Sequence, residues 1–164
     1  MTEPTSFDLH ATAEVAATAD VVYRVASDIT RMGEWSPECT GGEWTTGEPG
    51  AVGAHFKGHN RFRDDTWTTE CEVVAAEPGR RFAWAVLAQP DPSENPVWSF
   101  EIEPTADGCR LTQRFVMTSP PSRLLAIRDS LPPEKAATFL EFRRGRLQEA
   151  MQQTVDRIKA AVEG

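Results

Sequence analysis

The first 35 residues alternate in two successive ways. From Phe7 to Val15 every second residue is apolar and the residues between are polar, which is the period of a half-buried strand. After Thr18, a residue type that caps helices, the apolar positions up to Ile29 follow helical spacing. A second short helical or irregular segment is expected through Trp35, where Ser36-Pro37 redirects the chain. The pattern therefore predicts one strand followed by two short helices.

From Gly41 onward the two-residue period returns, interrupted by short turns such as Glu77-Pro78-Gly79. The expected strands cover residues 43–46, 52–62, 66–76, 80–88, 97–103 and 110–118. Parallel neighbours need crossover connections of about a dozen residues or more, whereas most of these connections are short. Six successive strands therefore predict an antiparallel meander.

The last third of the chain has helical character. A short helix is expected between Pro120-Pro121 and Pro132-Pro133, and a long amphipathic helix over 134–162. Its apolar face includes Leu147 and Met151, whereas the side chains expected to face away are Gln148, Gln152, Asp156 and Lys159. No repeat or linker interrupts the pattern. We expect an α+β fold, a curved antiparallel sheet of about seven strands wrapped on a long C-terminal helix, as a single domain over residues 1–164.

Charge and hydropathy exclude several classes of function. The net charge of −8 disfavours nucleic acid, because binding to phosphates depends on Lys and Arg. The one basic cluster, formed by Arg143, Arg144 and Arg146, is interpreted as a solvated helix face rather than an anion site. No apolar run approaches the roughly 18 residues of a membrane span, and no secretory signal is evident. We expect a cytoplasmic protein without a membrane span.

Metal and cofactor chemistry find little support. Cys39, Cys71 and Cys109 form no CxxC pair, so neither a zinc site nor a redox dithiol is indicated. His55 and His59 lie four residues apart in an expected strand, which separates them by roughly 13 Å, too far to share one ion. We expect no metal and no cofactor.

The order of elements resembles the helix-grip fold of the START-like (SRPBCC) superfamily, closest to its bacterial polyketide cyclase/dehydrase and lipid transport branch. The segments that carry the resemblance are residues 19–28, Trp35-Ser36-Pro37, 53–60, 67–71, 77–82 and Trp98. It covers essentially the whole chain, and it is the order of these motifs rather than any one of them that is specific. The resemblance implies an apolar cavity between the sheet and the last helix, and it does not imply one chemistry, since a shared fold hosts carriers, receptors and enzymes.

Alternation assigns the inner face of the sheet independently of the resemblance, because the more apolar set of each strand should face the helix. Three of the five tryptophans fall on this face, where large rings fill a core or line a pocket. The residues expected to contact a ligand come from this face, from the rim at Trp35 and from the long helix: Trp35, Phe56, Asn60, Trp67, Thr69, Trp84, Trp98, Gln113, Phe115, Phe139, Leu147 and Met151.

The polar residues of the inner face have two interpretations. Asn60 either bonds to neighbouring backbone or holds a ligand oxygen, and Gln113 favours the ligand because backbone groups in mid-strand are already paired. Cys71 is interpreted as a small buried hydrophobe. The face holds no Asp, Glu, His, Lys or Tyr, so a general acid or base would come from the helices and loops. The candidates are Asp28, Glu34, Glu38, Tyr23 and Arg143.

Three functions stay open at this point. The first is binding or transport of a small hydrophobic ligand such as a lipid, polyketide or isoprenoid. The second is a polyketide aromatase/cyclase or dehydratase, with Glu34, Glu38 or Arg143 reaching the substrate. The third is a partner-binding module, which requires an exposed apolar patch at Leu124, Leu125 and Ile127. Catalytic residues are not assigned, and the protein is expected to be a monomer or a homodimer.

Overall fold

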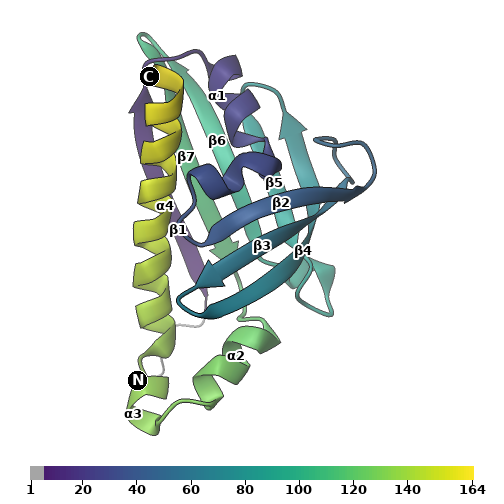
Figure 1. The fold of residues 1–164 in the computed structure, drawn as a ribbon, viewed down its shortest axis with the longest axis vertical. Coiled ribbons are helices and arrows are strands. Elements are labelled where there is room, and N and C mark those ends of the chain that lie inside the picture. The colour runs from purple at the N-terminus through teal and green to yellow at the C-terminus, as the bar shows by residue number, and fades with distance from the viewer. Residues whose placement is uncertain (1–5) are drawn as a thin grey trace.

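The computed structural model describes residues 6–164, and its order of elements is that of a strand, two short helices, a strand meander and a C-terminal helix (Figure 1). The strands are β1 (Phe7–Val15), β2 (Cys39–Thr46), β3 (His55–Phe62), β4 (Asp65–Glu77), β5 (Arg81–Val86), β6 (Val97–Thr105) and β7 (Gly108–Met117). The helices are α1 (Ala19–Ala26), the 3-10 turns η1 (Ile29–Glu34) and η2 (Pro92–Glu94), α2 (Ser122–Asp129), α3 (Pro133–Ala136) and α4 (Phe139–Glu163).

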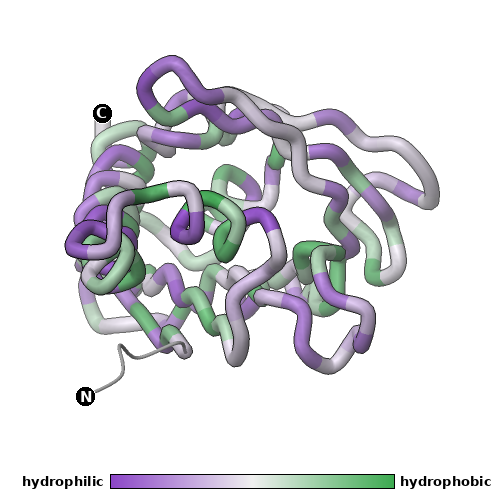
Figure 2. Tube along the Cα trace, turned by 90° about the horizontal axis from the view of Figure 1, so that it is seen from below, coloured by the Kyte–Doolittle hydropathy of each residue, from purple (hydrophilic) through white to green (hydrophobic). Residues whose placement is uncertain are grey.

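The seven strands form one antiparallel sheet in the order β1-β7-β6-β5-β4-β3-β2. The sheet curves, and α4 runs alongside β1 (Figure 1). The apolar residues of α4, among them Leu147 and Met151, are buried. Seen from the end at which α2 lies, the strands and helices surround a common interior (Figure 2). The expected α+β helix-grip architecture is confirmed. No helix of residues 6–164 is long and apolar enough to cross a membrane.

The largest differences from the predicted elements are at β2, at β3 and in the C-terminal helix. Strand β2 begins at Cys39 instead of residue 43, and β3 begins at His55 instead of residue 52. The chain turns through residues 47–53, where Gly47, Gly50 and Gly53 all have positive φ angles, a conformation that glycine adopts without strain. The helix expected over 134–162 is two helices, because Thr138 (φ −116°, ψ 5°) leaves the helical conformation between α3 and α4.

A seam of side-chain hydrogen bonds joins α4 to the edge strand β1. Three α4 side chains donate to alternate backbone carbonyl oxygens of that strand: Gln148 Nε2 to His10 (2.7 Å), Gln152 Nε2 to Thr12 (3.2 Å) and Lys159 Nζ to Glu14 (2.7 Å). Gln148, Gln152 and Lys159 lie outside the buried face of α4, as expected, and they also bond to the edge of the sheet. Four helical residues rise about as far as two strand residues, which is why Gln148 and Gln152 match His10 and Thr12. The seam supplies partners to a sheet edge that would otherwise be free.

The core lies between the concave face of the sheet and the helices. Odd-numbered residues of β1 are buried and even-numbered ones exposed, as the alternation predicts. Phe82, Phe100 and Leu111 of three neighbouring strands are almost fully buried, as are Leu140, Met151, Val155 and Ile158 of α4. Burial of one such side chain contributes about 1.5–3 kcal/mol. This packing fixes the distance between sheet and helix, and with it the space left in the interior.

Candidate ligand cavity

A cavity of about 400 Å³ lies between the concave face of the sheet and α4. Its volume is within the range of about 300–1,000 Å³ that small-molecule pockets occupy. Seven aromatic side chains line it: Trp35, Phe56, Trp67, Trp84, Trp98, Phe100 and Phe115. The space is therefore open rather than filled by its own tryptophans.

Eleven of the twelve residues expected to contact a ligand lie around this cavity. The exception is Phe139, the first residue of α4, which is half-buried against the core and does not line the cavity. Phe100 was absent from that prediction, although its alternation with Trp98 and Ile102 placed it on the same face. The structure thus brings the expected residues together, and their contact with a ligand stays a prediction.

The aromatic rings are in contact with one another at the sheet side of the cavity. Trp84 lies at the centre of the group, stacked on Trp98 at 6.5 Å between centroids and packed against Phe56 and Phe100 at 6.1 and 5.9 Å. Trp98 in turn packs on Phe115 at 4.2 Å. Such contacts stabilise ring orientations by about 0.5–1.5 kcal/mol each. The aromatic wall is held in place before any ligand arrives.

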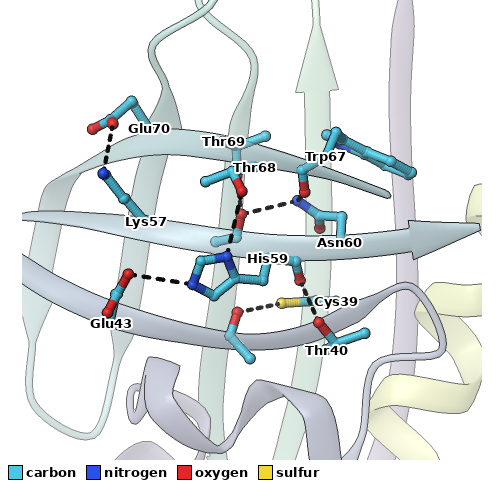
Figure 3. Close-up of polar contacts among 12 residues, drawn as sticks. Cys39, Thr40, Glu43, Lys57, His59, Asn60, Trp67, Thr68, Thr69 and Glu70 are labelled. Carbon is cyan, nitrogen blue, oxygen red and sulfur yellow. Dashed lines mark hydrogen bonds and ion pairs between the residues drawn. The ribbon is translucent and has the colours of Figure 1, made fainter. Parts of the chain in front are cut away.

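The side chain of Asn60 in β3 bonds to neighbouring backbone, which is the first of the two alternatives considered for this residue. Its Nδ2 donates to the carbonyl oxygens of Gly58 (3.2 Å) and Trp67 (3.5 Å), and Figure 3 shows Asn60 next to Trp67. Thr69 Oγ1 also donates to Gly58 at 3.4 Å. A Cβ at position 58 would approach Thr69 Oγ1 to 2.9 Å, so glycine leaves room for this cluster.

Both histidines of β3 contact residues of the neighbouring strands. His55 Nε2 lies 3.0 Å from Glu72, and His59 lies 3.4 Å from both Glu43 and Thr68 (Figure 3). Neither histidine lines the cavity. Within residues 6–164, no three His, Cys, Asp or Glu side chains converge as a metal site would require.

Gln113 of β7 and Trp35 after η1 each carry a buried polar atom without a protein partner. Gln113 is 6% exposed and its Oε1 accepts no hydrogen bond from residues 6–164; the same part of the chain offers no acceptor to Trp35 Nε1. Leaving such a group unpaired costs about 1–3 kcal/mol. Because both residues line the cavity, these atoms are candidates for pairing with a ligand. This agrees with the interpretation of Gln113 as a ligand contact.

Glu38 and Arg143 form a half-buried ion pair at the cavity. Arg143 donates from Nη2 to Glu38 Oε1 (2.6 Å) and from Nη1 to Oε2 (2.8 Å), and the two side chains are 14% (Glu38) and 17% (Arg143) exposed. Arg143 is therefore not part of a solvated helix face, and that interpretation is wrong for this residue. Arg144 and Arg146 are exposed as expected and pair with carboxylates of α4. The missed signal is that Arg143 precedes Leu147 by four residues, on the apolar face of α4.

The other suspected acid–base groups lie away from the cavity. Glu34 is exposed and bonded to Arg31, which holds the pKa of its carboxyl below the ordinary value. Tyr23 packs edge-on against Phe82, and burial raises the pKa of its hydroxyl. Asp28 accepts a bond from the Thr30 backbone at the start of η1. Of the five candidates, only Glu38 and Arg143 line the cavity.

Cys71 lines the cavity, but its thiol is a poor nucleophile. Burial raises its pKa to about 12, so the thiolate is scarce at neutral pH. Its one polar contact within the described chain is a 3.6 Å bond to Thr69 Oγ1. Cys71 is accordingly a small buried hydrophobe.

Helix α2 lies at the end of the molecule that faces the viewer in Figure 2, and its residues Arg123 and Leu124 line the cavity. It has no buried residue, and Arg123 attaches it to the β3–β4 hairpin through a 2.6 Å ion pair with Asp65 and a guanidinium 4.0 Å above the Trp67 ring. Leu124, which lines the cavity, is half-buried, as are Leu125 and Ile127. The exposed patch required by a partner-binding module is therefore not formed by these residues.

Comparison with known proteins gives a consistent result. In solved structures, the chain is similar to a Polyketide_cyc-like protein from Corynebacterium glutamicum, with 34% identity and a TM-score of 0.68 over 98% of this chain and 94% of that one. It is also similar in fold to the di-domain ARO/CYC StfQ from the steffimycin biosynthetic pathway (20% identity, TM-score 0.73), covering 97% of this chain and 51% of StfQ. A third similar fold is the major latex-like protein 151 of Panax ginseng (14% identity, TM-score 0.64; 96% and 98% covered). No curated protein matches the sequence significantly. The profile of the family "Polyketide cyclase / dehydrase and lipid transport" matches residues 6–163, and the chain belongs to that family.

Proposed function

We propose that the protein binds a small hydrophobic molecule, of the lipid, polyketide or isoprenoid kind, in the cavity between the sheet and α4. The observation that carries this proposal is a 400 Å³ space whose surface is mainly apolar and includes seven aromatic residues. Apolar pockets with a small number of placed polar groups are the usual form of small-molecule sites. The family description, which names lipid transport beside polyketide chemistry, supports the same conclusion.

The proposal is tested by filling the cavity. Ala150 lies on the cavity face of α4, so Ala150→Phe should remove ligand volume, whereas Ala160→Phe adds the same ring at an exposed position of the same helix. A panel of aromatic, fatty and isoprenoid compounds is titrated by calorimetry and thermal shift. We expect binding in the parent protein and in Ala160→Phe, with loss in Ala150→Phe. Failure of the whole panel to bind or stabilise the parent protein would refute the proposal.

A second candidate function, cyclisation or dehydration of a poly-β-keto chain, is favoured by the position of the Glu38–Arg143 pair. These reactions need a positioned acid or base, and this pair supplies the two suspected acid–base groups that line the cavity. If the protein is such an enzyme, Glu38→Gln abolishes turnover while binding persists. Glu34→Gln, which changes an exposed carboxylate outside the cavity, leaves turnover intact. Equal turnover in both variants counts against this function.

A further inference from the structure

The charges around the cavity are balanced pair by pair. Four charged side chains line it: Glu38, Glu70, Arg123 and Arg143. Glu38 and Arg143 pair with each other, Arg123 pairs with Asp65 at 2.6 Å, and Glu70 lies 3.9 Å from Lys57. The described part of the chain therefore offers a ligand no uncompensated charge at the cavity.

Arg143 nevertheless has N–H donors that are not used in its pair with Glu38. A guanidinium has five N–H donors, and Glu38 accepts from only one hydrogen on each Nη. The Nε–H and the outer Nη hydrogens donate to no residue in the described chain. Because the pair uses the end of the guanidinium, its Nε side can donate to a further oxygen without disturbing Glu38.

The two features together distinguish between kinds of ligand oxygen. An uncharged hydroxyl or ketone oxygen can accept from Arg143 while the ion pair stays intact. A carboxylate would bring a third charge to a balanced, mostly apolar site, where burial of an uncompensated ion is costly. It would also have to lie close to Glu38, whose carboxylate repels it.

We propose that the cavity selects an uncharged amphiphile, with a ring-containing body against the aromatic wall at Trp84 and a hydroxyl or ketone oxygen at the Arg143 guanidinium. This inference rests on the proposed binding function and specifies its ligand class. The Gln113 amide, buried at the same cavity, offers a second point at which a ligand hydroxyl donates.

The test uses three probes that share one ring system: naphthalene, 2-naphthol and 2-naphthoate, titrated by calorimetry at pH 7. We expect the unmodified protein to bind 2-naphthol at least about tenfold more tightly than either other probe, as one hydrogen bond to a charged donor allows. Binding of 2-naphthoate as tight as that of 2-naphthol would overturn the inference. Equal affinity for naphthalene and 2-naphthol would also overturn it.

Two variants separate charge balance from simple hydrophobicity. Glu38→Gln leaves Arg143 uncompensated, so the preference should reverse and 2-naphthoate should bind more tightly than 2-naphthol. The double variant Glu38→Gln with Arg143→Met restores zero charge without the donor, and should bind naphthalene and 2-naphthol equally. An unchanged probe order in Glu38→Gln refutes the role of the pair. If either variant fails to fold, the probe order in the unmodified protein decides.

The two levels of proposal fail in different ways. If no compound of the broad panel binds, the proposed function is wrong and the ligand class with it. If hydrophobic compounds bind but charged and uncharged probes are not distinguished, the binding function stands and the selection by Arg143 is wrong.

Discussion

Gln113 gives a direct measure of what a buried, unpaired polar atom costs this protein. Its Oε1 has no hydrogen-bond partner in residues 6–164, and the residue is only 6% exposed. Methionine has a similar length and no carbonyl, so Gln113→Met removes the unpaired acceptor without opening a large cavity. The penalty removed is about 1–3 kcal/mol, less some loss of packing. We expect a net gain of about 1–2 kcal/mol, which raises Tm by about 2–8 °C in a chain of this size.

Urea unfolding, followed by circular dichroism, measures this change, and the m value should stay constant because the surface exposed on unfolding is the same. Gln148→Met is the matched control. It removes the 2.7 Å bond to the His10 carbonyl oxygen and should destabilise the protein by about 0.5–1.5 kcal/mol.

The same substitution at Gln113 should weaken binding of a ligand that donates a hydroxyl to this amide. Gain of stability with loss of affinity is therefore the signature of a polar group kept for the ligand. A Gln113→Met protein that is less stable than the parent by more than about 1 kcal/mol would refute the reasoning, because it would show that the amide is paired in the folded protein.

Three further predictions concern helix α2, two glycines and the thiol of Cys71. Arg123→Ala should raise the association and dissociation rates of the ligand about fivefold in stopped-flow measurements, with little change in Kd, because the cation–π contact and the surface ion pair of Arg123 together stabilise the closed position of α2 by about 1 kcal/mol. Unchanged rates would show that α2 does not gate the cavity. Gly145→Ala should stabilise the protein by about 0.5–1 kcal/mol, because the space around its Cβ position in α4 is open. Gly33→Ala should destabilise it by about 1–3 kcal/mol, because the new Cβ would lie 2.3 Å from a backbone oxygen of β2. Urea unfolding measures both changes, and the opposite order would contradict this packing. Cys71 should resist alkylation at pH 8 until the protein unfolds. Because burial raises the pKa of its thiol to about 12, the folded state binds this proton more tightly than the unfolded state, and the contribution of Cys71 to stability falls as pH rises from about 9 to 12. A Cys71→Ala protein should lack that part of the decline.

The strand meander and its inner face were predictable because their signal is local. A two-residue period within one strand is enough to assign its buried side, and the short turns leave antiparallel pairing as the consistent topology. Alternation alone therefore assigned Phe56, Trp84 and Phe115 to the face that lines the cavity. Phe139 was misplaced because helical periodicity does not say where along α4 the cavity ends.

The polar part of the site was less accessible to sequence reasoning. Glu38 and Arg143 are separated by 105 positions, and their contact depends on how far α4 extends past the start of β2. A cluster of three arginines on a helix is usually solvated, and that general expectation concealed the one that lies on the apolar face. The helical position of Arg143 relative to Leu147 and Met151, rather than its neighbours in sequence, separates it from the other two.

The seam between α4 and β1 has a consequence for how the protein folds. Its bonds join residues 138, 140 and 145 positions apart, and β1 also pairs along its length with β7, so the first strand is held mainly by segments that follow residue 107. Contacts of such high sequence separation slow folding, because a long loop must close before they form. The aromatic side of the cavity can form from β3 to β7 through short-range hairpins, but the opposite side of the cavity forms only when α4 packs on the sheet. Ligand binding should therefore appear late in refolding, together with the final gain of stability, and not in any intermediate that contains the meander alone.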